Sequence, residues 1–235
     1  MRGGVGRSVA LTLTEDHDIA INYRVSDEAA TEVVELAKKG SNVITVRTDV
    51  CNPEAVESMI AEVVNDLGGL DAVINNAGII EPDLVTDIDN QQWDQVLDTN
   101  LIGAFYITRT AIPHLEPDGD IVLISSIGGT GGTVDASYAA SKAGLHGLTR
   151  SLVREYGDRG LQVNVAAPGP VEIEMNDTIV KYLEAVDFRG HENVDTQLPE
   201  YACQPEYIAH TVEYLLENKY IYGEIANING GMQFQ

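Results

Sequence analysis

Tyr138 and Lys142 stand four residues apart in the segment Tyr-Ala-Ala-Ser-Lys and could form an acid/base pair. Residues at this spacing share one face of a helix, so the phenol and the ammonium group can approach each other. A nearby cation favours the phenolate and lowers the pKa of a tyrosine from about 10. Tyr138 could then give a proton to a carbonyl oxygen or take one from an alcohol. By itself, the pair is equally compatible with two exposed helix residues.

Further polar residues follow predicted buried strands. Ser125 and Ser126 end the apolar run 121–124, the segment 75–78 (Asn-Asn-Ala-Gly) ends the preceding run, and a Pro-Gly turn follows the next one. Asn100 lies inside a helical pattern. Ligands of open α/β sheets bind beyond the carboxyl ends of the strands. We therefore expect these residues to gather around Tyr138 and Lys142.

The elements that must position these residues alternate along the chain. Apolar runs predict strands at residues 19–23, 43–46, 70–74, 121–124, 163–166 and 224–228, and helical patterns cover 6–15, 28–39, 53–67, 91–115, 137–156 and 205–216. This alternation predicts an α/β fold, a doubly wound parallel sheet with helices on both faces. The length of 235 residues suits one domain, 1–235. The irregular stretch 172–204 is expected to form a substrate lid.

The amino end lacks one expected part of this fold. A glycine turn at residues 3–6 leads directly into the first helix, and no apolar run precedes it. In a dinucleotide-binding sheet a strand feeds this turn. Either the sequence starts late or another segment fills the centre of the sheet. We favour a late start and therefore expect the first strand to be missing or truncated.

Composition excludes several classes of protein. The formal charge of −23 opposes binding to nucleic acid and to anionic membranes. The spread of acidic residues along the whole chain favours a halophilic host, in which salt screens the self-repulsion. No apolar run is long enough to span a membrane, and two cysteines cannot form a four-ligand metal site. We expect a cytoplasmic protein without a metal.

The ordered motifs closely resemble those of the short-chain dehydrogenase/reductase family, from Arg2 to Gly231. The resemblance implies a Rossmann-type fold and an enzyme that interconverts a ketone and a secondary alcohol with a nicotinamide cofactor. By position, Tyr138 would be the acid/base, and Lys142 would lower its pKa and hold the nicotinamide ribose. Asn100 would hold a water molecule in a proton relay.

The family also uses a serine that donates a hydrogen bond to the substrate carbonyl. The usual spacing of thirteen residues to the tyrosine selects Ser125. Alignment of the strand end and of Gly128 selects Ser126, with a loop one residue shorter. We prefer Ser126.

The resemblance also implies a cofactor site. Arg2 and Arg24 replace the acidic group typical of NAD sites and favour NADP, with NAD as a weaker alternative. The remaining residues that match cofactor contacts of the family are Gly4, Val5, Gly6, Asp49, Val50, Asn76, Ala77, Gly78, Tyr138, Lys142, Pro168, Gly169 and Val171.

The substrate is predicted from the region that follows Tyr138, which resembles reductases of 3-oxoacyl thioesters on acyl carrier protein or coenzyme A. The segment 22–24 (Asn-Tyr-Arg) looks equally like glucose dehydrogenases, so a sugar or polyol dehydrogenase is the alternative. A non-catalytic NADP-binding regulator is the alternative of another class. By family analogy we expect a homotetramer that acts on a small-molecule carbonyl or alcohol.

Overall fold

The computed structural model describes residues 4–37, 40–186, 198 and 202–232. Arg2 and much of the predicted lid lie outside these residues. The elements in chain order are α1 (Val5–Leu13), β1 (Ile19–Tyr23), α2 (Asp27–Leu36), β2 (Val43–Arg47), α3 (Pro53–Leu67), β3 (Leu70–Asn75), α4 (Asn90–Leu97), η1 (Asp98–Ile102), α5 (Gly103–Ala111), η2 (Ile112–His114), β4 (Leu115–Ile124), α6 (Gly128–Gly131), α7 (Ala136–Tyr156), η3 (Gly157–Arg159), β5 (Gln162–Pro168), α8 (Glu174–Ala185), α9 (Pro205–Glu217) and β6 (Ile225–Ile228).

The strands are all parallel and fall into two hydrogen-bonded groups. One group has the order β3-β4-β5-β6, and the other pairs β1 with β2. Within the part of the chain that the structure describes, no strand joins β1 to β3. This arrangement confirms the predicted doubly wound α/β class.

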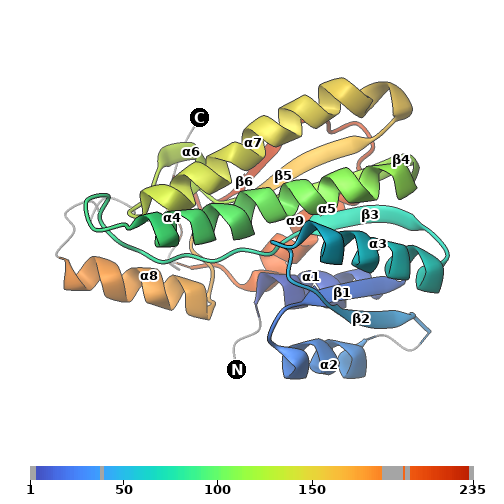
Figure 1. Ribbon diagram of the computed structural model, residues 1–235, viewed down its shortest axis with the longest axis horizontal. Helices are drawn as coiled ribbons and strands as arrows, with labels where there is room; N and C mark the ends of the chain where they lie inside the picture. Colours follow the sequence, from blue (N-terminus) through green and yellow to red (C-terminus); the bar gives the residue numbers. More distant parts are fainter. Residues whose placement is uncertain (1–3, 38–39, 187–197, 199–201, 233–235) are drawn as a thin grey trace.

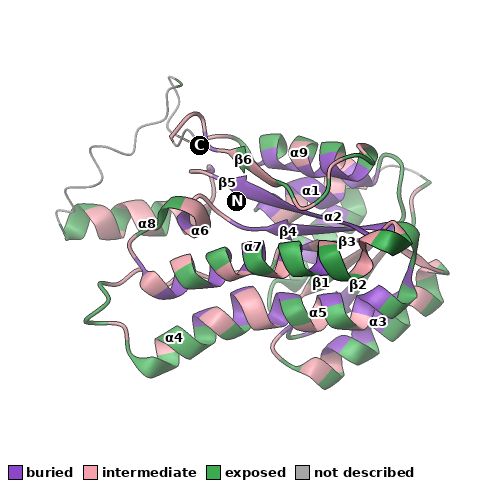
Figure 2. Cartoon of the chain, turned by 90° about the horizontal axis from the view of Figure 1, so that it is seen from above, coloured by how far each residue is buried: buried purple, intermediate pink, exposed green. Residues whose placement is uncertain are grey.

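Helices cover both faces of the sheet, and alternating side chains of β4 serve the two cores. Ile121 and Leu123 join the core under α3, α5 and α7, whereas Val122 and Ile124 join the core under α1 and α9. Successive residues of a strand point to opposite faces of the sheet. The residues on both faces must therefore be apolar when the sheet is buried on both sides. Figure 1 shows α5 and α7 in front of the sheet, and Figure 2 shows the buried strands between the two helical layers.

The helix bounds agree best with the sequence where capping residues mark them. The helix predicted at 53–67 is observed as α3 with these bounds. Asn52 accepts a hydrogen bond from the Ala55 amide at its start, and Gly68 ends it with a φ of 84°. The proline at its first position lacks only an amide that the helix would leave free.

The prediction of one long helix at 91–115 is wrong in detail. The chain forms α4, a wide π-helical turn (η1), α5 and a short 3-10 turn, and Leu115 already belongs to β4. Asn100 lies in the wide turn, and its side chain bonds to the backbone of Ile79. The hydrophobic period cannot show such a one-residue expansion, which frequently marks a functional site.

A close backbone contact joins α6 to α7 beside the functional residues. A Cβ atom added to Gly129 would lie 2.7 Å from the carbonyl carbon of Lys142. By contrast, a Cβ atom on Gly147, an exposed residue of the same α7, would meet no atom within 4 Å. The α6–α7 contact therefore requires a glycine at position 129, whereas α7 does not require one at 147.

We predict opposite effects of alanine at these two glycines. Gly129→Ala should lower the free energy of unfolding by about 1–3 kcal/mol, because the new methyl group pushes α6 off α7. Gly147→Ala should raise it by about 0.5–1 kcal/mol, because alanine favours an open helix position. Denaturant melts of both variants measure the changes. A Gly129→Ala variant as stable as the parent chain would contradict the contact.

Candidate active site

Tyr138 and Lys142 lie in the first turns of α7, beside the carboxyl end of β4. Their exposed fractions are 7% and 4%, so both polar groups are buried. The Lys142 ammonium donates a hydrogen bond of 2.8 Å to the Ile124 carbonyl and lies 5.6 Å from the centroid of the Tyr138 ring. The structure thus brings the two side chains together in a site that largely excludes water.

Burial shifts the pKa values of both groups away from their charged forms. Burial raises the pKa of Tyr138, a hydrogen bond with Ser126 acts in the opposite direction, and the charge of Asp135 raises it further. Burial also lowers the pKa of Lys142 to about 8. On balance the pKa of Tyr138 is raised, mainly by burial, and the lowering of this pKa by Lys142 stays a prediction.

The two adjacent serines have different surroundings. Ser126 hydrogen bonds with the Tyr138 side chain, and its oxygen also accepts a bond of 3.1 Å from the Gly128 amide. Ser125 points into the protein, where its hydroxyl donates to the Lys142 carbonyl and lies 2.8 Å from Nε2 of His146. Only Ser126 therefore faces the phenol, in keeping with our preference for Ser126.

Asn100 reaches the site from the wide turn η1 and is almost fully buried. Its oxygen accepts from the Ile79 amide, and its NH₂ group donates to the Ile79 carbonyl and to Ser141. The Ser141 hydroxyl in turn donates to the Tyr138 carbonyl. The Asn100 side chain thus ties the loop after β3 to the helix that carries Tyr138.

Two glycines keep space open beside these residues. A Cβ atom on Gly78 would lie 3.2 Å from the Lys142 nitrogen, and one on Gly6 would lie 2.6 Å from the Asn76 amide nitrogen. Gly4 and Val5 begin α1, whose first amides point out of the helix end and can bind an anion. These positions form a cradle that larger side chains would fill.

Basic residues lie at the other end of this cradle. The Arg24 guanidinium lies 3.9 Å from the Asp49 carboxylate, and Asp49 also accepts from the Cys51 amide. Arg47, at the end of β2, donates to the Arg24 carbonyl. The Arg47 side chain therefore contacts the backbone of Arg24, at the ends of β1 and β2. Arg47 does not stand out in the amino-acid sequence, because its proximity to Arg24 follows from the register of the two strands.

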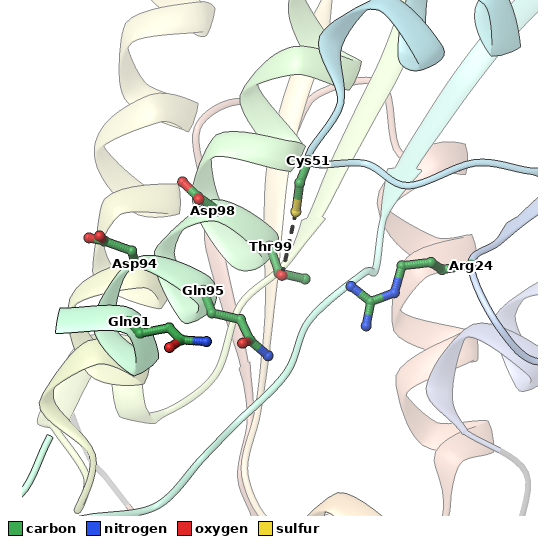
Figure 3. Close-up of a pocket in the computed structure, with 7 residues that line it drawn as sticks. All are labelled: Arg24, Cys51, Gln91, Asp94, Gln95, Asp98 and Thr99. Atoms are coloured by element: carbon green, nitrogen blue, oxygen red, sulfur yellow. Dashed lines mark hydrogen bonds between the residues drawn. The ribbon is translucent and has the colours of Figure 1, made fainter. Parts of the chain in front are cut away.

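One pocket among the described residues is lined by Arg24 and not by Tyr138. It has a volume of about 520 Å³ and is lined by polar groups from α4, η1 and the loop after β2. Figure 3 shows Cys51 and Thr99 at one side of the pocket and Arg24 at the other. The full lining is Arg24, Cys51, Gln91, Asp94, Gln95, Asp98 and Thr99.

The other predicted cofactor residues follow strand ends. Val50 is buried where a Cβ atom on Gly103 would touch it, and Ala77 is exposed in the loop after β3. Pro168 ends β5, Gly169 donates to the Ile228 carbonyl, and Val171 pairs with Cys203. These residues surround the carboxyl edge of the sheet.

In the described ranges, no group of three or more His, Cys, Asp or Glu residues is placed to hold a metal ion. No helix among them is long and apolar enough to cross a membrane.

Comparison with known proteins gives matches along nearly the whole chain. Residues 1–233 match the family described as enoyl-(acyl carrier protein) reductase. The 3-oxoacyl-[acyl-carrier-protein] reductase FabG of Staphylococcus aureus is 40% identical over 97% of this chain and 94% of its own length. The reductase of that name from Escherichia coli is 31% identical over 97% of this chain and 93% of its own length.

Solved structures agree in fold. A dehydrogenase/reductase of Sinorhizobium meliloti superposes with a TM-score of 0.88 at 31% identity, over 98% of this chain and 91% of that one. A short-chain dehydrogenase of Burkholderia cenocepacia, solved in complex with NADP, has a TM-score of 0.88 at 30% identity, over 97% and 93% of the two chains.

We predict that the buried ammonium group destabilises the protein in a pH-dependent way. Between pH 8 and 10.5, Lys142 is neutral in the folded chain and protonated in the unfolded chain. Because the unfolded state then binds more protons, stability rises with pH in this window. Relative to Lys142→Met, the free energy of unfolding of the parent chain should rise by about 3 kcal/mol across it. Denaturant melts at several pH values measure the difference, and a constant difference would contradict the burial of a charged group.

Proposed function

The chain belongs to the short-chain dehydrogenase/reductase family, and from this we propose that it reduces 3-oxoacyl thioesters with NADPH. In the reaction, the ketone, NADPH and a proton give a secondary alcohol and NADP⁺. The observation that carries the proposal is the cluster of Ser126 with the buried Tyr138 and Lys142, beside the Gly78 backbone of the cofactor cradle. The names of the relatives from Staphylococcus aureus and Escherichia coli support the thioester substrate.

The proposed roles follow from the contacts. Ser126 donates a hydrogen bond to the substrate carbonyl, and the Tyr138 hydroxyl gives its proton to the same oxygen as the alcohol forms. The resulting phenolate lies near the Lys142 ammonium, whose charge stabilises it. Asn100 acts by holding the Ile79 backbone and Ser141 in place and is a positioning residue.

The cradle fits a dinucleotide. Gly6 and Gly78 leave the space that its backbone needs, and the amino end of α1 offers amides to its pyrophosphate. When bound, the nicotinamide supplies the hydride that reduces the carbonyl carbon. Lys142 is placed to hold the nicotinamide ribose, and the polar pocket near Cys51 is placed to receive the adenosine end. Arg24 and Arg47 favour a 2′-phosphate and hence NADP over NAD.

We further propose a homotetramer in a cytoplasm of high salt, built from single-domain chains (1–235) with a lid formed by 172–204. Trp93 on α4 and Phe105 on α5 are partly exposed, with fractions of 37% and 38%, and support a helix-to-helix contact between copies. Tyr182 of α8 bonds to Asp83 in the loop after β3, which supports a covering role for α8. The charge of −23 supports adaptation to salt.

The substrate test is the consumption of NADPH with acetoacetyl-coenzyme A, and a parallel assay offers glucose with NADP⁺. We expect reduction of the thioester. Ser126→Ala should lower kcat about 100-fold, because the carbonyl loses its hydrogen-bond donor. The matched variant Ser125→Ala should retain turnover. Loss of activity in Ser125→Ala alone would overturn the serine assignment, oxidation of glucose alone would select the sugar dehydrogenase, and NADPH binding without any turnover would select a regulator.

Cofactor preference is tested separately at Arg24. Arg24→Ala should raise the KM for NADPH about tenfold, because one charge-assisted bond to the 2′-phosphate is lost. The KM for NADH should change little, since NADH lacks that phosphate. Steady-state kinetics with both cofactors measure the change, with Arg159→Ala at an exposed arginine of η3 as the control. Equal losses with both cofactors would argue against phosphate recognition by Arg24.

A further inference from the structure

Asp135 has an unusual backbone and a fully enclosed side chain. It immediately precedes α7, three residues before Tyr138, and is only 2% exposed. Its φ is 101°, and only one other described non-glycine residue, Asp118, has a positive φ. A side chain in this backbone region is strained, so the surrounding contacts must hold it there.

The Asp135 carboxylate joins two separate segments of the site. One oxygen accepts from the Tyr138 amide at 3.0 Å and from the Ser137 hydroxyl. The other oxygen accepts from the amide of Glu81, in the loop after β3, at 3.3 Å. All three partners donate, and a carboxylate interacts favourably with the positive potential at the amino end of α7.

This anion belongs to the few charged groups that act on Tyr138. From α7 the Lys142 ammonium lies 5.6 Å from the ring centroid, and Ser126 contributes a neutral hydroxyl from the end of β4. In the loop after β3, the Glu81 carboxylate accepts from Gln95 of α4, and the Asp83 carboxylate accepts from Tyr182 of α8. Asn100, from η1, is neutral. Among the described groups, Asp135 is therefore the anion that directly adjoins the first turn of α7, which carries Tyr138.

We propose that Asp135 is a positioning residue that locks the first turn of α7 in place and holds Tyr138 in its protonated form, which suits the site to reduction. The proposal rests on the proposed function, because a protonated phenol serves as the acid that reduction needs, whereas alcohol oxidation needs the phenolate. The proposed effect on Tyr138 agrees with the electrostatics, since the charge of Asp135 and burial both raise the pKa of Tyr138. Removal of the charge should therefore favour the phenolate.

The test is Asp135→Asn, in which the amide oxygen still accepts from the Tyr138 amide while the charge is lost. The ionisation of Tyr138 is read from phenolate ultraviolet absorbance as the difference between each protein and its Tyr138→Phe counterpart. We expect the midpoint to move to lower pH by about one unit, which is a tenfold change in the ionisation constant. In steady-state assays, the alkaline-rising limb of kcat/KM for alcohol oxidation should move by the same amount.

Two controls keep the test decisive. Asp118→Asn removes the charge of the other aspartate with a positive φ, which lies in the exposed amino half of β4, and should leave the Tyr138 titration unchanged. Asp135→Ser keeps a capping oxygen without a charge, so it should show the same shift if Asp135→Asn does not fold. An unchanged titration midpoint in a folded variant, with only a lower Tm, would overturn the proposal. Because the absorbance titration needs no substrate, this result is distinct from a failure of the thioester assay.

Discussion

The site depends on the attachment of α7 to the carboxyl end of β4. The Lys142 ammonium donates to the Ile124 carbonyl at 2.8 Å, and the Ser125 hydroxyl donates back to the Lys142 carbonyl at 3.0 Å. These reciprocal bonds fix α7 against the end of β4 beside Tyr138 and Ser126. Because every partner is buried, the bonds are not exchanged for water, and Ser126 is left facing the phenol.

This attachment places charged groups where hydration is lost. The ammonium of Lys142 and the carboxylate of Asp135 are both more than nine-tenths buried, and each is held by hydrogen bonds from or to the protein. Buried charges are costly unless such bonds compensate them. The arrangement lowers stability but gives a preorganised site. In this site fixed charges, and not mobile water, determine the protonation state of Tyr138.

The opposite end of the cradle shows a different use of charge. In a chain with 37 acidic and 14 basic residues, Arg24 and Arg47 still meet at the ends of adjacent strands. The general acidity discourages polyanions such as nucleic acids, whereas a local arginine can still contact one phosphate. A strongly acidic chain and recognition of an anionic cofactor are therefore compatible, because such recognition needs only short-range contacts.

The amino-acid sequence by itself determined the alternation of strands and helices, the bounds of α3 through its Asn52 and Gly68 caps, and the shared face of Tyr138 and Lys142. These features depend on residues within one or two turns, so local periodicity and capping chemistry reveal them. Only the tertiary structure decided which serine faces Tyr138 and where the helix widens at Asn100. It also decided which distant segments Asp135 and Arg47 contact. Asp135 meets the Glu81 amide, 54 residues away along the chain, and Arg47 meets Arg24, 23 residues away. Such pairs arise from the register of parallel strands and the path of loops, which no local pattern contains. The direction of the pKa shift of Tyr138 likewise depends on burial, which the local sequence does not show.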